Sequence, residues 1–221
     1  MFILIPLCLV FAALVLFREE KKHYVPAAVF KGLASLCFVI LGFICTPGGR
    51  TADRLIAGLI LGAIADVLLN LRNILKEKAK LVFLVGILVF LLGHILYLTA
   101  VLPLTDHKPA AVLTGVVLTA LFIRWIFTKV TAEKVFKAFG IVYVGAIIVL
   151  NSVALFNLIE HRSPFTVCFM IGALLFLVSD IILILNTFGS ESRLRLRVVN
   201  LTLYYIGQLL IAISLSLLAG V

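Results

Sequence analysis

The stretch LILGAIADVLLNL at residues 59–71 decides the fold of this chain, because it places a carboxylate, Asp66, inside a long apolar run. A second run of the same kind, GALLFLVSDIILIL at residues 172–185, contains Asp180. A charge inside hydrocarbon costs about 2.5–3.5 kcal/mol or more. Two aspartates in such surroundings therefore indicate membrane-spanning segments with a function.

The composition of the whole chain points to the same class of protein. Of its 221 residues, 64% are hydrophobic and 13% are charged, and the mean hydropathy is +1.28. We expect an all-α, polytopic membrane protein with a single integral membrane domain over residues 1–221, since a spanning helix takes about 20 apolar residues. The eight apolar stretches lie at about 2–17, 24–45, 54–71, 81–102, 109–127, 135–158, 164–188 and 199–220.

The basic residues are distributed unevenly between the predicted loops. Of the 19 lysines and arginines, 14 lie after the first, third, fifth and seventh stretches, and the other loops hold four. Basic loops mark the cytoplasmic side, so we expect both termini outside. The net charge of +9 follows from this topology and from contact with membrane lipids, and it does not predict a nucleic-acid partner.

The two aspartates have matching surroundings. His94 follows Asp66 by 28 residues and Gln208 follows Asp180 by the same distance, each directly after a glycine. This spacing predicts two parallel four-helix repeats, related by an axis along the membrane normal. The predicted halves are residues 1–104 and 105–221.

Other polar side chains fall at similar depths in the predicted spans. At a rise of 1.5 Å per residue, most lie between the cytoplasmic boundary and the membrane midplane. Such groups turn away from lipid and pair with one another. Because several helices contribute polar side chains at the same depth, we expect these side chains to line one pocket. The candidates for substrate contact are Gln208, Tyr205, Tyr143, Lys31, Asn70 and Asn186.

The candidate catalytic residues are Asp66, Asp180 and His94. Two neighbouring buried carboxyl groups cannot both ionise cheaply, which favours one acid and one base. The alternative is a structural role, in which the aspartates are neutral or pair with Lys31 or His94 and so hold helices together. The four cysteines show no metal-ligand spacing, and no zinc-protease or P-loop motif is present.

Four stretches occur in an order that resembles the YhhN-like family, the lysoplasmalogenases, from about Lys31 to Ser214. They are GLILGAIADVLLNL, VGILVFLLGHILYL, GALLFLVSDIILIL and LTLYYIGQLLIAISL. The second aspartate of the family appears here in the pair Ser179-Asp180. The chain departs from the family where Ala65 replaces the usual glycine before Asp66, and where Gly32 follows Lys31 in place of the usual proline.

The resemblance implies hydrolysis of the sn-1 vinyl ether of lysoplasmalogens, which gives a fatty aldehyde and a glycerophospho-base. The substrate is then a lysophospholipid, and no metal or organic cofactor is expected. One aspartate would act as acid and the other as base, by analogy with two-carboxylate glycosidases. His94 and Gln208 would orient the water, while Tyr143, Tyr205 and Lys31 would face the headgroup.

Another class of function fits the same residues. A proton-coupled transporter of a small amphiphile would also use repeats and carboxylates within the membrane. The sequence leaves the oligomeric state open, and the short loops favour a bacterial inner membrane as the location.

Overall fold

A computed structural model describes residues 3–189 and 193–220 of the chain. This part is helical and contains no strand. Its long helices are α1 (Leu4–Glu20), α2 (Tyr24–Cys45), α3 (Arg50–Leu71), α4 (Ala79–Val101), α5 (Lys108–Ile126), α6 (Lys134–Glu160), α7 (Pro164–Phe188) and α8 (Leu194–Ser214). Within the described residues, seven helical segments are long and apolar enough to cross a membrane, and α1 is shorter, at 17 residues. The prediction of an all-α polytopic membrane protein is confirmed.

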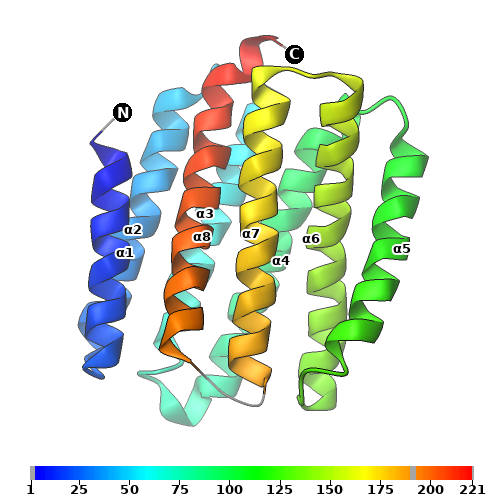
Figure 1. The fold of residues 1–221 in the computed structure, drawn as a ribbon. Coiled ribbons are helices and arrows are strands. Elements are labelled where there is room, and N and C mark those ends of the chain that lie inside the picture. The colour runs from blue at the N-terminus through cyan, green and yellow to red at the C-terminus, as the bar shows by residue number, and fades with distance from the viewer. Residues whose placement is uncertain (1–2, 190–192, 221) are drawn as a thin grey trace.

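The helices form one antiparallel bundle, in which α1 begins and α8 ends at the same end (Figure 1). Six helices pack in a closed ring in the order α2, α3, α4, α6, α7 and α8, with α8 returning to α2. Helix α1 lies outside this ring against α2 and α8, and α5 lies outside it against α6. The ring encloses the space in which buried polar groups can meet.

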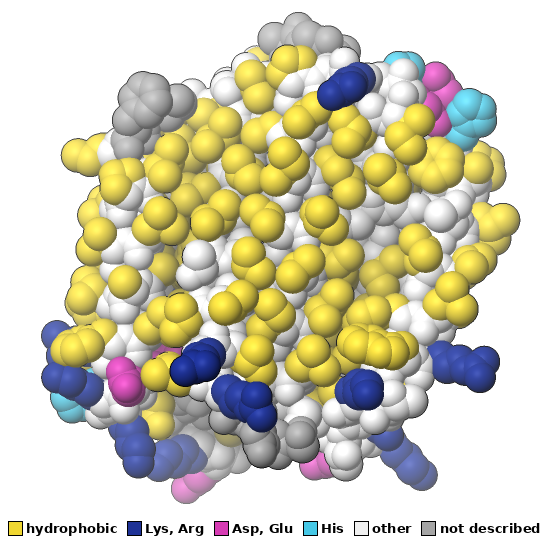
Figure 2. Space-filling view, viewed as in Figure 1, with side chains coloured by type: hydrophobic (Ala, Val, Ile, Leu, Met, Phe, Trp, Pro, Cys, Tyr) yellow, Lys and Arg dark blue, Asp and Glu magenta, His cyan; other side chains and the backbone are white. Residues whose placement is uncertain are grey.

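The surface divides into bands along the bundle axis (Figure 2). Apolar side chains cover the middle of the visible face, as a lipid-facing surface requires. Lysines and arginines gather at one end, where the chain passes from α1 to α2, from α3 to α4, from α5 to α6 and from α7 to α8. We call this the basic end; the prediction that it faces the cytoplasm stays a prediction.

Glycines set the two tightest helix hairpins. A Cβ atom on Gly207 of α8 would lie 2.8 Å from the carbonyl oxygen of Gly172 on α7. In the α3–α4 hairpin, a Cβ atom on Gly93 would lie 3.3 Å from the carbonyl oxygen of Gly58. The two glycine pairs are 114 residues apart, like the two aspartates. This correspondence agrees with an internal repeat, which remains a prediction.

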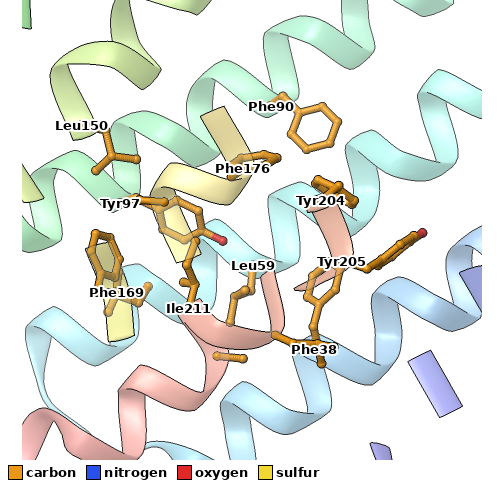
Figure 3. Close-up of a cluster of buried hydrophobic side chains, with 14 of the residues drawn as sticks. Phe38, Leu59, Phe90, Tyr97, Leu150, Phe169, Phe176, Tyr204, Tyr205 and Ile211 are labelled. Carbon is orange, nitrogen blue, oxygen red and sulfur yellow. The ribbon is translucent and has the colours of Figure 1, made fainter. Parts of the chain in front are cut away.

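An aromatic cluster fills the centre of the ring (Figure 3). Phe176 of α7 is fully buried, with its ring centroid 5.1 Å from that of Tyr204 and 6.0 Å from that of Phe90. The same ring stacks on His94 at 4.7 Å, with the two planes 11° apart. Rigid packing of this kind fixes the side chains that carry the polar groups described next.

Candidate active site

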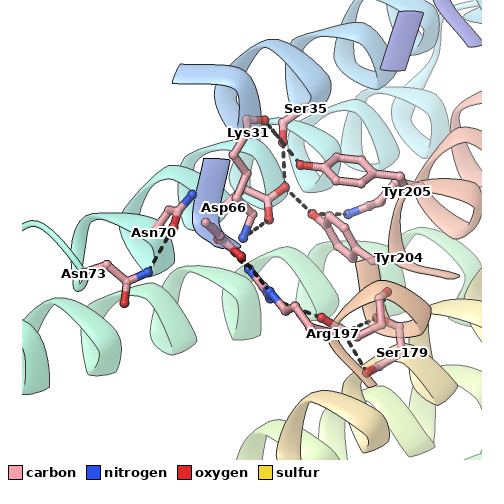
Figure 4. A network of polar contacts seen from close by, with 12 residues as sticks. Lys31, Ser35, Asp66, Asn70, Asn73, Ser179, Arg197, Tyr204 and Tyr205 are labelled. Carbon is pink, nitrogen blue, oxygen red and sulfur yellow. Dashed lines mark hydrogen bonds and ion pairs between the residues drawn. The ribbon is translucent and has the colours of Figure 1, made fainter. Parts of the chain in front are cut away.

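Asp66 lies at the centre of a buried polar network (Figure 4). Its Oδ2 accepts hydrogen bonds from the hydroxyl of Ser35 at 2.6 Å and from that of Tyr204 at 2.7 Å. The Nζ of Lys31 lies 3.2 Å from Oδ1, and both charged side chains are at most 5% exposed. Lys31 and Ser35 are one turn apart on α2, so both face α3. A cation and two hydroxyl donors are surroundings that suit an ionised carboxylate.

Asp180 has fewer partners. It is 5% exposed, and its Oδ2 accepts a hydrogen bond from the hydroxyl of Tyr143 on α6 at 2.5 Å. No lysine, arginine or histidine in the described part of the chain pairs with it. The preceding residue, Ser179, bonds the backbone and side chain of Asn200 on α8, which fixes this turn of α7. The two aspartates thus have unequal electrostatic surroundings.

Both aspartates line one cavity, which extends towards the basic end. Its empty space is about 940 Å³, part of it continuous with solvent. Apolar walls come from α4, α6 and α7, through Phe83, Phe136 and Phe188. The polar side chains of the wall include Lys31, Asp66, Asn70, Arg72, Asn73, Tyr143, Asp180, Arg197, Asn200 and Tyr204. A cavity with acidic groups inside and a basic rim suits an amphiphile with an anionic head.

Gln208 lies behind the cavity wall. Its Nε2 donates to the hydroxyl of Tyr204 at 3.2 Å, and its Oε1 accepts from the hydroxyl of Tyr97 at 3.0 Å. A Cβ atom on Gly62 would come within 2.9 Å of the Gln208 amide, so the glycine leaves room for it. Gln208 therefore connects to Asp66 through Tyr204.

His94 is buried among aromatic rings. Its Nδ1 lies 2.8 Å from the carbonyl oxygen of Phe90, which can only accept, so Nδ1 carries the proton. The ring of Tyr143 is perpendicular to the imidazole, with centroids 5.3 Å apart. Nε2 is buried without a hydrogen-bond partner among the described residues. This leaves an unused acceptor beside the tyrosine that holds Asp180.

The remaining candidates divide between the cavity and its surroundings. Asn70 lines the cavity and accepts from the Asn73 amide at 3.3 Å. The hydroxyl of Tyr205 points instead to the carbonyl oxygen of Lys31, at 3.4 Å. Asn186 is half-buried near the end of α7, where it accepts from the backbone N–H of Arg193 at 2.7 Å, and it is not part of the cavity wall. Of the nine candidates, those in the wall are Asp66, Asp180, Lys31, Asn70 and Tyr143.

Several polar residues at the site were not among the candidates, and four of them contact Asp66 or carry a positive charge in the cavity wall. Ser35 and Tyr204, which bond Asp66, each lie four residues from a candidate, one helical turn away. Periodicity could have identified both. Arg72 and Arg197 line the cavity, but the sequence interpretation explained them by topology alone.

A second group of ligand-type side chains lies at the opposite end of the bundle. Ligand atoms of Asp106, Glu160 and His161 are within 4.8 Å of one another. Glu160 already accepts bonds from the Thr105 hydroxyl and from the backbone N–H of Asp106, at 2.6 and 2.7 Å. These bonds join the α4–α5 connection to the end of α6, which gives the cluster a structural role.

Comparison with known proteins gives one result. The model of the YhhN family matches residues 26–215. No curated protein and no solved structure matches the chain.

Proposed function

The chain belongs to the YhhN family, and on this premise we propose that it is a membrane hydrolase of lysoplasmalogens, cleaving the sn-1 vinyl ether. The observation that carries the proposal is the pair of buried carboxyl groups, in unequal surroundings, on the wall of one amphipathic cavity. Vinyl ether cleavage needs one carboxyl group that gives a proton and another that stays negative.

The surroundings of the two aspartates suggest their roles. Asp66 has a cation and two hydroxyl donors, which stabilise its negative charge. Asp180 has one hydroxyl donor and no cationic partner in the described structure. Burial of a neutral carboxyl group costs less solvation free energy than burial of an unpaired carboxylate, so these surroundings favour the neutral form. We assign Asp180 as the general acid, and Asp66 as the anion that stabilises the cationic intermediate and accepts a proton from water.

The reaction then proceeds in three steps. Asp180 gives its proton to the vinyl carbon remote from the ether oxygen, and the double bond becomes an oxocarbenium ion. Water adds to the cationic carbon and loses a proton to the Asp66 carboxylate, which forms a hemiacetal. As the hemiacetal collapses, its hydroxyl gives up its proton and the departing sn-1 oxygen takes one up, which gives a fatty aldehyde and the free sn-1 hydroxyl of the glycerophospho-base. Asp66 then releases the proton that it took from water and Asp180 takes one up, by exchange with solvent, so that both groups return to their starting states.

The buried residues behind the wall would position these groups. Tyr143 orients Asp180, and the chain of hydroxyl and amide groups through Tyr204 and Gln208 orients Asp66. The unpartnered Nε2 of His94 offers an acceptor for a water beside Tyr143. Metal and organic cofactors are not required by this chemistry.

The proposal includes the finer architecture predicted from the sequence. The chain would form two parallel four-helix repeats, and its basic loops would place both termini outside and the cavity mouth at the cytoplasmic surface. A single-chain lipid would reach the cavity from the inner leaflet of a bacterial inner membrane.

Product analysis by mass spectrometry tests the function. Purified protein in detergent is incubated with an alkenyl lysophospholipid and with its alkyl and acyl analogues. The proposal expects fatty aldehyde from the alkenyl lipid alone, and none from Asp180→Asn. Asp53→Asn, at the opposite end of α3 and outside the cavity, is the matched control and keeps wild-type turnover. Turnover by Asp180→Asn, or none by the wild type, would overturn the proposal.

A proton-coupled transporter of a small amphiphile is the competing function. It requires the carboxyl groups to face each side of the membrane in turn. The cavity here extends to the basic end, and the aromatic cluster packs at the centre of the ring (Figure 3), which favours the hydrolase. Uptake of an alkyl lysophospholipid into proteoliposomes, driven by a pH gradient, would instead support transport.

A further inference from the structure

Two of the three cations in the cavity wall already have anionic partners. Lys31 pairs with Asp66 at 3.2 Å. Arg197 of α8 forms two parallel bonds to Glu19 of α1, at 2.9 and 3.0 Å, and a third to Asn200 at 3.3 Å. These bonds occupy N–H donors on all three guanidinium nitrogens of Arg197. Neither side chain is therefore available to neutralise a ligand without losing its partner.

Arg72 is the wall cation that forms no ion pair in the described part of the chain. It follows the last residue of α3, and its guanidinium carbon lies 4.6 Å from the centroid of the Phe83 ring. Within residues 3–189 and 193–220, it forms no ion pair and no side-chain hydrogen bond. Burial and the neighbouring charge of Arg197 lower the pKa of Arg72, and the charge of Glu19, which is paired with Arg197, offsets only part of that shift. An anion in contact with the guanidinium would relieve both effects. An aromatic face on one side leaves the guanidinium edge for an anion.

A second unused donor lies in the same wall. Asn70 is 2% exposed, and its Oδ1 accepts from the Asn73 amide. Its Nδ2 is buried and has no hydrogen-bond partner among the described residues. Because buried donors are nearly always satisfied in folded proteins, this amide is suited to a ligand oxygen.

We propose that Arg72 and Asn70 form a phosphate subsite of the cavity, which selects single-chain lipids with a phosphate over those without one. This inference rests on the proposed hydrolase function, because it takes the cavity to be the site of a single-chain lipid substrate. It transfers the anion-binding role from Lys31, the sequence candidate, to Arg72, since Lys31 is committed to Asp66.

The apolar wall next to Arg72 favours a lipid phosphate over free phosphate. Phe83 contacts Phe136 and Phe188, with ring centroids 5.6 and 6.1 Å apart, and all three rings line the cavity. A ligand that meets both surfaces carries an anionic group and an apolar chain. Inorganic phosphate would use the polar surface alone.

Binding of uncleavable ligands tests the subsite independently of catalysis. Isothermal titration in detergent compares a 1-alkyl-glycerol-3-phosphate, the corresponding 1-alkylglycerol and inorganic phosphate. An alkyl ether lacks the double bond that the proposed reaction protonates, so the result stands whether or not alkenyl lipids are hydrolysed. In the wild type we expect the alkyl phosphate to bind at least about tenfold more tightly than the other two ligands.

Variants identify the residues responsible. Arg72→Gln should reduce the preference for the alkyl phosphate over the alkylglycerol by about tenfold, and Arg72→Lys should restore part of it, because lysine keeps the charge and loses the planar fork. Asn70→Leu should reduce the same preference by a smaller factor. Lys76→Gln, an exposed basic residue outside the cavity, is the matched control and keeps the preference.

Several results would overturn the subsite. An unchanged preference in Arg72→Gln, or equal weakening of both alkyl ligands in Arg72→Gln and Arg72→Lys, would remove Arg72 from phosphate recognition. Inorganic phosphate that binds the wild type as tightly as the alkyl phosphate would rule out the lipid headgroup as the source of the anion. Hydrolysis tests that fail while this preference holds would refute the hydrolase and leave the phosphate subsite.

Discussion

The Lys31–Asp66 ion pair has two roles, because it places a cation beside a proposed catalytic group and joins α2 to α3. Removal of one partner from a buried pair leaves an uncompensated charge and costs about 3–5 kcal/mol, whereas replacement of both partners is often nearly neutral. The pair is therefore a poor measure of net stability, and its clearest effect is to hold a positive charge 3.2 Å from the Asp66 carboxyl group.

A double-mutant cycle on this pair gives a stability prediction. Lys31→Met and Asp66→Asn should each lower the unfolding temperature in detergent, and the double variant should regain most of the loss. All three variants should lack hydrolase activity. Additive losses of stability in the double variant would show that the two charges do not interact.

Tyr143 gives a prediction about Asp180, since its hydroxyl is the hydrogen-bond donor that the structure shows for this carboxyl group. Tyr143→Phe should lower kcat by about tenfold or more with little change in KM, because the acid loses its orientation and the substrate keeps its contacts. Tyr24→Phe, outside the cavity at the start of α2, serves as the control. A change confined to KM would assign Tyr143 to substrate binding.

At the residue scale, the sequence could reveal the groups that are costly in lipid. Asp66, Asp180 and Lys31 stand out for that reason, and the structure places all three in one cavity wall. Ser35 does not stand out, since a serine is ordinary in a membrane helix. The likeness of Asn186 to Asn70 predicts a place in the site, but the structure shows its side chain accepting from the backbone N–H of Arg193, just before α8.

At the scale of the element, glycines decide how closely α7 and α8 approach. Gly207→Ala should destabilise the protein by about 1–3 kcal/mol, because its Cβ would lie 2.8 Å from a backbone oxygen that cannot move alone. Gly93→Ala should cost less, as the nearest atom is at 3.3 Å. Gly140→Ala meets nothing within 4 Å and is the control. Thermal unfolding checks this order, and equal effects at all three positions would contradict the packing argument.

The helices extend beyond the apolar stretches that predicted them. Helix α3 begins at Arg50 rather than near residue 54, and Arg54 donates to the carbonyl oxygen of Thr99 at 2.6 Å. Helix α8 begins at Leu194 rather than near residue 199, and its first turns contain Arg197, which pairs with α1. Hydropathy detects the part of a helix that lies in lipid. The ends of these helices lie beyond that part, and their arginines form polar contacts with neighbouring helices.

At the scale of the whole molecule, the hydropathy and the length of the apolar stretches are enough to predict the helical membrane fold. They could not predict that α2 meets α8, or that α4 meets α6, which closes the ring around the cavity. Both lipid-facing and helix-facing surfaces are apolar, so periodicity carries little information about helix neighbours. The one indication of this arrangement in the sequence is that the polar residues of several helices lie at the same predicted depth.

The orientation of the bundle is open to a labelling test. In a cysteine-free background, Lys78→Cys lies in the α3–α4 connection at the basic end, and His107→Cys lies in the α4–α5 connection at the opposite end. A membrane-impermeant thiol reagent on intact cells should label His107→Cys, and Lys78→Cys only after permeabilisation. The reverse pattern would place the cavity mouth outside.

Hydrolysis in D₂O tests the central claim most directly, because acid catalysis by Asp180 transfers a solvent-derived proton to carbon. Wild-type protein is incubated with an alkenyl lysophospholipid, the aldehyde is trapped as it forms, and authentic aldehyde is carried through as the exchange control. The account predicts fatty aldehyde with one deuterium at carbon 2. Absence of aldehyde, or aldehyde without deuterium at that carbon, would contradict it.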